Sequence, residues 1–273
     1  MLHTINIHPR DKLLFFEPRR HAYSSKKCAY LKSVSKVINS LFSSFNADVV
    51  ISNMMKSEKW PQSKYFEMTP SEIKLLWNSN GKDARNAGTK LHDQIEKYCN
   101  NEEFDADEDD RALDQFIAWD HKKQWTPYRT EWKIFDDDFK VAGTIDAVFK
   151  NKKKEFVMVD WKRCKEISRG NSFQSSIVPE LDHLPDCKLV RYSMQLNLYK
   201  KIVEKNYGIK ISRMLIVNIH PLQNTFLEID ALDLSREMDI VLGSTGKQEK
   251  KPSRILRADL SKGIKITGTL FIE

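Results

Sequence analysis

Apolar residues recur along this chain at two spacings, the three- and four-residue steps of amphipathic helices and the two-residue step of half-buried strands. The helical spacing predicts helices over residues 33–56, 70–79, 83–100, 111–125, 188–206 and 235–242. The alternating runs predict strands near 128–136, 139–150, 155–162, 211–219 and 225–230. Together they predict an α/β fold, in which a mixed central β-sheet is flanked by helices and an N-terminal helical region precedes it.

The chain is expected to form one domain over residues 1–273. Its hydrophobic content of 40% is enough to build one core, and no long linker rich in Gly, Pro or Ser divides it. Within this domain we distinguish a mostly helical region 1–82, a core 83–230 and a basic C-terminal extension 231–273. The stretch 165–187 has few periodic apolar positions, which predicts an irregular loop near the candidate site.

Two neighbouring predicted strands carry the first candidate site. Asp146 lies on one of them, while Asp160 and Lys162 lie two residues apart on the next and therefore point to the same face. Two carboxylates can hold a hard divalent cation through oxygen, and a neighbouring ammonium can orient a water or stabilise negative charge on a phosphorane. The triplet Asp-x-Lys taken alone is more often a solvated charge pair at a strand end.

A second constellation lies on the predicted helix 83–100. His92 and Glu96 are four residues apart, so they share one helix face and both can reach a single site. Taken alone, such a histidine is more often found at a core edge and such a glutamate beside a lysine. The company of the two acidic strands favours a metal-binding role for this helix face.

A third constellation lies on the predicted helix 188–206. Gln195 and Tyr199 form another polar pair at four-residue spacing, beside an apolar stripe. Neutral donors of this kind suit a phosphate backbone, and we count Arg191 with them as a nucleic-acid contact. Packing and hydrogen bonding at the surface is an equally common role for such a pair.

These motifs follow one another in a fixed order within residues 83–203. The order is Gly88-Thr89-x-x-His92 with Glu96, Glu131 ahead of Ala142-Gly143-Thr144-Ile145-Asp146, then Val159-Asp160-Trp161-Lys162, and finally Gln195-x-x-x-Tyr199. In order and approximate spacing the chain resembles the RecB-like branch of the PD-(D/E)xK nuclease superfamily. That branch includes CRISPR-associated exonucleases, the mitochondrial genome maintenance exonuclease and viral and phage relatives.

The resemblance implies a restriction-endonuclease-like core and a role for each residue of the motifs. The implied metal ligands are His92, Asp146, Asp160 and the carbonyl of Trp161. The implied catalytic residues are Asp146, Asp160, Lys162 and Glu96, with Glu131 as a supporting acid. Gln195, Tyr199 and Arg191 are expected to hold the nucleic-acid strand near the scissile phosphate.

The four cysteines argue against two further kinds of site. Some RecB-like nucleases hold an iron–sulfur cluster with one early cysteine and three closely spaced late ones, whereas Cys28, Cys99, Cys164 and Cys187 are scattered. No iron–sulfur cluster is therefore expected. Unpatterned cysteines without a signal peptide also indicate reduced intracellular thiols rather than disulfides.

Charge and hydropathy suit a polyanionic partner. The net charge is +7 and the pI is about 9.0, with eight Lys and Arg against two acids between residues 1 and 46 and a second basic stretch at 247–265. Seven acids within 102–110 indicate a solvated loop. No apolar run approaches the length of a membrane span, so no membrane partner is expected.

These observations together predict a nuclease dependent on Mg²⁺ or Mn²⁺, with one or two ions, that cleaves DNA as an exonuclease on single strands or free ends. A histidine ligand favours Mn²⁺ relative to Mg²⁺. The alternatives are a flap endonuclease, an RNA nuclease and a catalytically silent nucleic-acid-binding module. Replication or recombination proteins are possible partners. An intracellular site of action is expected, in the cytoplasm, the nucleus or a host cell, with mitochondria not favoured.

Overall fold

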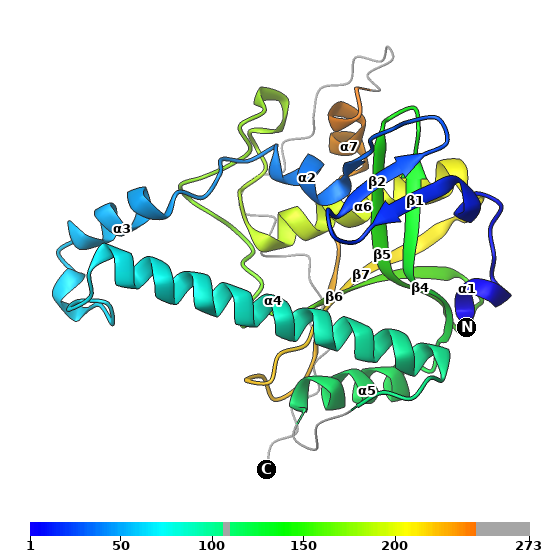
Figure 1. Ribbon diagram of the computed structural model, residues 1–273, viewed down its shortest axis with the longest axis horizontal. Coiled ribbons are helices and arrows are strands. Elements are labelled where there is room, and N and C mark those ends of the chain that lie inside the picture. The colour runs from blue at the N-terminus through cyan, green and yellow to red at the C-terminus, as the bar shows by residue number, and fades with distance from the viewer. Residues whose placement is uncertain (106–109, 244–273) are drawn as a thin grey trace.

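A computed structural model describes residues 1–105 and 110–243, and its centre is a six-stranded mixed sheet (Figure 1). Along one path the strand order is β3-β5-β6-β7-β8, and β4 pairs with β5. The strands are β3 (Lys32–Ser33), β4 (Thr126–Asp136), β5 (Val141–Lys150), β6 (Phe156–Lys162), β7 (Ile211–Asn218) and β8 (Leu227–Asp230). The sheet with flanking helices and a helical N-terminal region confirms the predicted α/β fold class.

Strand β5 has a divided edge that positions the site. On one side it pairs with β4 in antiparallel fashion from residue 141 to residue 150. On the other side, β3 pairs in parallel with 141–142, and β6 pairs in antiparallel fashion with 147–150. In the described part of the chain, the segment 143–146 therefore lies between two strand partners on this edge.

Helices cover both faces of the sheet, because alternate residues of the central strands are apolar on both sides. On one face, α2 (Val34–Asn39), α6 (Lys188–Asn206) and α7 (Ser235–Val241) share a core with Met158 and Ile216. On the other face, α5 (Arg111–Lys123) and the second half of α4 (Pro70–Asn100) pack against Val159 and Leu215. Full burial of such a side chain stabilises the fold by about 1.5–3 kcal/mol.

Helix α4 is continuous, so the prediction of separate helices at 70–79 and 83–100 was wrong. It runs through 31 residues from a capping box at Thr69, in which Thr69 and Glu72 cap each other's backbone amides. The second half buries Leu91 and Ile95, whereas Ala84 is exposed. The first half extends away from the sheet and needs no apolar stripe facing it, which explains why the apolar spacing underestimated its length (Figure 1).

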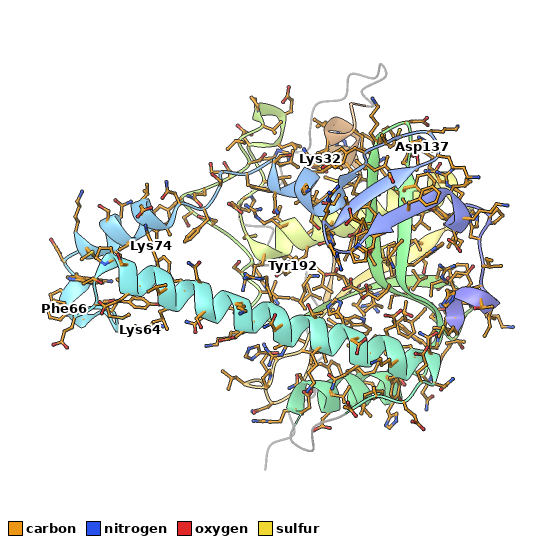
Figure 2. The ribbon with its side chains drawn as sticks, in the orientation of Figure 1. Lys32, Lys64, Phe66, Lys74, Asp137 and Tyr192 are labelled. Atoms are coloured by element: carbon orange, nitrogen blue, oxygen red, sulfur yellow. The ribbon has the colours of Figure 1, made fainter. Side chains whose placement is uncertain are left out.

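The predicted helix 33–56 is in fact two helices. Helix α2 ends at Asn39, and α3 begins at Ala47 and ends at Met55, with Asn46 accepting hydrogen bonds from the amides of Asp48 and Val49. Helix α3 packs against the projecting half of α4, and we call this projection the arm. Figure 2 shows Lys64 and Phe66 near its far end.

The N-terminal region also contains strands that the sequence pattern did not predict. After α1 (Leu2–Ile5), β1 (Leu14–Glu17) and β2 (Ala22–Ser25) form an antiparallel hairpin. Tyr23 of this hairpin is buried against Phe135 and Ala142, and its hydroxyl lies 3.0 Å from Thr144 Oγ1. The hairpin is thereby fixed beside the divided edge of β5.

The remaining predictions agree closely with the structure. Helix α6 has the predicted bounds, and α5, α7 and β4 to β8 begin and end within three residues of theirs. The stretch 165–187 is irregular apart from one helical turn, Pro179–Leu181. It is tied to the end of α2, because Ile177 N and Ser176 Oγ both donate to the carbonyl of Leu41. The C-terminal basic stretch 247–265 lies outside the described residues.

None of the described helices has the length and apolar character needed to cross a membrane.

Candidate active site

A cleft of about 880 Å³ opens beside the divided edge of β5. It has walls from four parts of the chain: the N-terminal hairpin, the middle of α4, the strands β4 and β5, and α6. The lining side chains that carry the argument below are Tyr23, Gly88, Thr89, His92, Glu96, Glu131, Gly143, Thr144, Gln195 and Tyr199. The cleft wall therefore carries residues of the second and third constellations, and Asp146 of the first lies 3.8 Å from His92.

His92 lies at the centre of a group of acceptors. Its Nδ1 is 3.3 Å from Glu131 Oε1, and its Nε2 is 3.3 Å from the carbonyl oxygen of Trp161 and 3.8 Å from Asp146 Oδ2. One ligand atom each from His92, Glu131 and Asp146 lies within 4.8 Å of the others. Three side chains from α4, β4 and β5 thus form a compact donor set.

The electrostatic surroundings favour positive charge at this point. Burial on its own lowers the pKa of His92, but the carboxylates of Asp146 and Glu131 outweigh burial and raise the pKa to about 9. Both ring nitrogens then carry protons and donate, one to Glu131 and one to the Trp161 carbonyl. The carboxylates stabilise a positive charge at this point, and at neutral pH the protonated ring of His92 supplies it.

Asp146 lies where β5 and β6 separate. The ladder between these strands ends at the pair Ala147 and Val159, and beyond it the amide of Trp161 donates to Asp146 Oδ2 at 2.9 Å. The side chain of Asp146 thereby replaces a strand carbonyl as acceptor. This bond fixes the peptide of Trp161, whose carbonyl faces His92.

Asp160 and Lys162 form a buried ion pair at the end of β6. Asp160 is 1% exposed, and its Oδ2 lies 2.5 Å from Lys162 Nζ, while Oδ1 has no hydrogen-bond partner among the described residues. Burial raises the pKa of Asp160. For Lys162, burial lowers the pKa, but Asp160 and Asp146 raise it above its ordinary value. A buried carboxylate oxygen without a donor is costly unless a cation or proton satisfies it.

Two further acids border the same cleft. Burial and the nearby Glu131 carboxylate raise the pKa of Glu96, since two neighbouring carboxylates resist ionising together. Glu131 has a φ of 42° inside β4, a left-handed conformation that non-glycine residues rarely adopt. Such strain costs about 1–3 kcal/mol and is concentrated at functional sites. Here it accompanies the contact of Glu131 with His92.

Gln195 and Tyr199 lie at the cleft as predicted, on α6. Gln195 Nε2 donates to the Tyr199 hydroxyl at 3.1 Å, and burial raises the pKa of Tyr199 well above its ordinary value, so its hydroxyl stays protonated. The Tyr199 ring packs directly on Gly143, where an added Cβ would lie 2.6 Å from Tyr199 Cε1. The glycine of the Ala-Gly-Thr motif is therefore required by the close approach of α6 to β5.

Arg191 is the one predicted contact that lies elsewhere. Its Nε is 2.6 Å from Asp186 Oδ1, its NH1 donates to Asn39, and its guanidinium lies 4.3 Å from the centre of the Phe42 ring. Arg191 does not line the cleft. These contacts tie α6 to α2 and to the loop before α6, which indicates a structural role.

The adjacent Tyr192 was not predicted, although it lies beside Lys162. Lys162 Nζ lies 4.8 Å from the centre of the Tyr192 ring, the residue labelled on α6 in Figure 2. The Tyr192 ring is therefore a second neighbour of the Lys162 ammonium besides Asp160. The available signal was helical spacing, because Tyr192 precedes Gln195 by three residues and shares its face.

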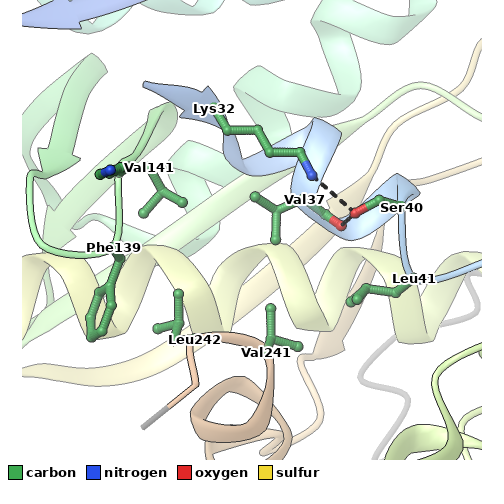
Figure 3. A pocket seen from close by; sticks show the side chains of 9 residues that line it. Lys32, Val37, Ser40, Leu41, Phe139, Val141, Val241 and Leu242 are labelled. Atoms are coloured by element: carbon green, nitrogen blue, oxygen red, sulfur yellow. Dashed lines mark hydrogen bonds between the residues drawn. The ribbon is translucent and has the colours of Figure 1, made fainter. Parts of the chain in front are cut away.

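A second hollow, of about 340 Å³, offers no comparable chemistry. It lies between α2, α7 and the turn from β4 to β5, and Figure 3 shows its mainly aliphatic and aromatic lining. Its polar contact in that view is Lys32 Nζ donating to Ser40 Oγ at 3.2 Å. With neither an acid nor a histidine in its lining, it is not a candidate metal site.

The large cleft does fit a divalent cation. One imidazole, several carboxylates and a peptide carbonyl form a mixed nitrogen and oxygen donor set, which suits Mn²⁺ and, through its oxygens, Mg²⁺. Asp160 Oδ1 has no donor among the described residues, and burial together with the Glu131 carboxylate raises the pKa of Glu96, so a cation would stabilise the ionised form of both groups. His92, Asp146 and the Trp161 carbonyl are the closest candidates for ligands, with Glu131 and Asp160 beside them.

Comparisons with known proteins identify no family. No protein-family model matches the chain, and no curated protein matches it. Among solved structures it has a likeness to one titled "Crystal structure of SSO0001", with 18% identity, a TM-score of 0.25 and coverage of 49% of this chain and 54% of that chain. A likeness this low carries no argument about function, and the chain spans only about half of that protein.

Proposed function

We propose that this protein is a divalent-metal-dependent nuclease that hydrolyses phosphodiester bonds in DNA, most simply as an exonuclease on single strands or free ends. The observation that carries the proposal is the donor set of His92, Glu131 and Asp146, whose ligand atoms lie within 4.8 Å, next to the buried pair of Asp160 and Lys162. The order of these motifs resembles RecB-like nucleases, and the mixed α/β fold is compatible with that resemblance.

The residues in and beside the cleft would have separate roles in such a reaction. His92, Asp146, Asp160 and the Trp161 carbonyl would hold the metal, with Glu131 and Glu96 as supporting acids. Bound Mg²⁺ or Mn²⁺ would lower the pKa of water and neutralise charge on a phosphoryl group. Lys162, held between Asp160 and the Tyr192 ring, places a fixed ammonium where a water or a phosphate oxygen needs orientation.

The opposite wall of the cleft supplies groups for the strand itself. Gln195 and the neutral hydroxyl of Tyr199 are uncharged donors on α6 that suit phosphate oxygens. The cleft is also large enough for several atoms of a backbone to pass between α4 and the N-terminal hairpin. A role in DNA replication, repair or recombination inside a cell is consistent with this activity.

The proposal is tested with purified variants that remove charge but keep shape. We expect Asp160→Asn and Asp146→Asn to lower cleavage of linear DNA by about a hundredfold or more, since each removes an electrostatic contact at the reacting group. Asp138→Asn is the matched control, because Asp138 is an exposed acid whose ion pair among the described residues is with Lys205. Mn²⁺ should support activity at least as well as Mg²⁺.

Several outcomes would reject or redirect the proposal. Near wild-type cleavage by Asp160→Asn would show that the activity does not come from this site. DNA binding without cleavage under any divalent metal would indicate a silent binding module, and preference for RNA or for flaps would indicate those nucleases instead. Because Lys162→Met would leave a buried carboxylate unpaired, at a cost of about 3–5 kcal/mol, that variant is interpreted only with its melting temperature.

A further inference from the structure

A cluster of basic side chains lies directly beyond the catalytic lysine. Arg163 and Lys165 follow the end of β6, and His220 follows the end of β7. These strands are parallel, with Lys162 opposite Asn218, so both segments leave the same edge of the sheet. Lys188, the first residue of α6, joins them, because its Nζ donates to the carbonyl of Glu166 at 2.8 Å. The loops after β6 and β7 and the start of α6 therefore bring four nitrogen-bearing side chains to the end of the sheet at which Lys162 lies.

The backbone that carries this cluster is held by buried amides. Asn218 is fully buried, and its side chain both donates to the carbonyl of Cys164 at 2.8 Å and accepts from the Cys164 amide at 3.1 Å. Gln223 Nε2 donates to the carbonyl of Lys165 at 3.1 Å. Gln115 Nε2 donates to the carbonyl of His220 at 3.0 Å. The loops after β6 and β7 are thus fixed to each other and to α5.

The cluster lacks acidic partners. In the part of the chain that the structure describes, no carboxylate forms an ion pair with Arg163, Lys165, Lys188 or His220. Burial lowers the pKa of His220, and the positive charges of Arg163, Lys165 and Lys188 lower it further. His220 Nδ1 accepts from the amide of Leu222 at 3.2 Å, which leaves a hydrogen on Nε2 of the neutral ring.

The cluster adjoins the catalytic lysine through Cys164. Burial raises the pKa of the Cys164 thiol, while the positive charges of Lys188 and Lys162 act to lower it. The amide of Ile219, next to His220, donates to the carbonyl of Lys162 at 2.7 Å. Among the described residues the basic cluster has no carboxylate partner, and it lies next to a site whose own residues are mainly acidic. These charges suit an anion that extends beyond the bond that is cleaved. A phosphodiester backbone has one negative charge per nucleotide, so a phosphate next to the cleaved one can reach this cluster.

We propose that Arg163, Lys165, Lys188 and the neutral His220 bind a backbone phosphate of the nucleic-acid strand next to the one that is cut. This inference rests on the proposed nuclease function and names the subsite that fixes the register of the strand. Arg163 supplies a planar fork for two phosphate oxygens, and the lysines supply point charges. Holding the neighbouring phosphate places the scissile one against Lys162 and the metal ligands.

The test combines variants with single-stranded oligonucleotides in which one phosphate at a time is replaced by an uncharged methylphosphonate. Affinity is measured by fluorescence anisotropy in Ca²⁺, without turnover. We expect Arg163→Gln and Lys188→Gln each to weaken binding about tenfold and to reduce the slope of log affinity against log salt by about one. Lys153→Gln, in the turn at the opposite end of β6, is the matched control and should leave both unchanged.

The decisive result is non-additivity at one position. Neutralising one particular phosphate should weaken binding of the wild-type protein about tenfold but have little further effect on Arg163→Gln, because the same contact is already lost. Strict additivity at every position, with unchanged melting temperatures, would overturn the subsite while leaving the nuclease proposal intact. Failure of the wild-type protein to bind any oligonucleotide would overturn both.

Discussion

His92 is the residue at which a bound metal ion and a proton would compete. Its ring lies between Glu131, Asp146 and the Trp161 carbonyl, and the two carboxylates outweigh burial and raise its pKa to about 9 from an ordinary value of 6.5. A metal ligand must be the neutral imidazole, so an ion that uses His92 displaces a proton at neutral pH. Without an ion, the protonated ring stabilises the fold fully below pH 6.5, and that contribution is lost as the pH rises through 9.

Metal affinity should therefore rise with pH. Between about pH 6.5 and 9 we expect the Mn²⁺ dissociation constant to fall about tenfold per unit, with close to one proton released per ion, and to level off above pH 9. Calorimetric titration in buffers of different ionisation enthalpy measures the protons directly. His92→Gln should bind Mn²⁺ more weakly and without this proton release. Equal affinity and proton release in the variant would return His92 to a structural role.

At the residue scale, the sequence was informative about side chains that lie on one face of one element. The spacings of His92 with Glu96 and of Asp160 with Lys162 predicted their common direction, and the structure brings them together. The sequence did not predict the position of side chains that is set by tertiary contacts. Arg191 pairs with Asp186 and Asn39, whereas Tyr192, one position later, lies over Lys162, and helix periodicity alone does not choose between two adjacent residues.

Gly143 and Gly88 both line the cleft, but the space beside the α-carbon differs between them. Gly143 in β5 has the Tyr199 ring against its α-carbon, whereas a Cβ added at Gly88 in α4 would meet nothing within 4 Å. Glycine inside a helix is less stable than alanine by about 0.5–1 kcal/mol. The presence of glycine rather than alanine at position 88 therefore suits a cleft wall that leaves space for a ligand.

Alanine at these two positions should have opposite effects on stability. We expect Gly88→Ala to raise the free energy of unfolding by up to about 1 kcal/mol, and Gly143→Ala to lower it by about 1–3 kcal/mol through overpacking against Tyr199. Both variants should cleave DNA more slowly, Gly88→Ala because its methyl group narrows the cleft. Urea unfolding and cleavage rates check the two expectations separately. Full activity in Gly88→Ala would show that the strand does not approach α4 there.

At the element scale, bounds were predictable where burial imposes a pattern. Helix α6 is covered by neighbours, and its apolar period predicted both ends. Helix α4 was divided in two by the prediction because its first half lies on the arm, where solvent imposes no period, and only the capping box at Thr69 marks its start. The break after α2 was visible in principle, since Ser33 and Asn46 are both N-cap residues.

For the whole molecule, the N-terminal hairpin is the part that changes the expected shape of the site. It was not predicted, because each strand has only four residues, yet it forms one wall of the cleft. The loop 165–187, which was expected near the site, packs on the end of α2, and none of its residues lines the cleft. The candidate roof over a bound strand is therefore the hairpin.

A strand held under a fixed hairpin should enter from a free end. Tyr23 bonded to Thr144 and the pairing of β3 with β5 fix this wall to the sheet. We expect linear single-stranded DNA to be degraded to short products under conditions in which closed single-stranded circles stay intact. Electrophoresis of both substrates in one reaction measures the difference. Rapid cutting of the circles would favour an endonuclease and would show that the strand enters from the side.

Helix α4 joins the arm to the candidate metal ligand His92 without a break. His92 lies 22 residues beyond Pro70, so about 33 Å of continuous helix separates the imidazole from the outer end of the same rod. A tilt of about 5° that draws His92 toward an ion displaces that end by about 3 Å. In a rigid helix, a small rotation at His92 would thus give a larger displacement at the outer end of the arm. Binding of a partner to that end would in turn shift the position of the imidazole.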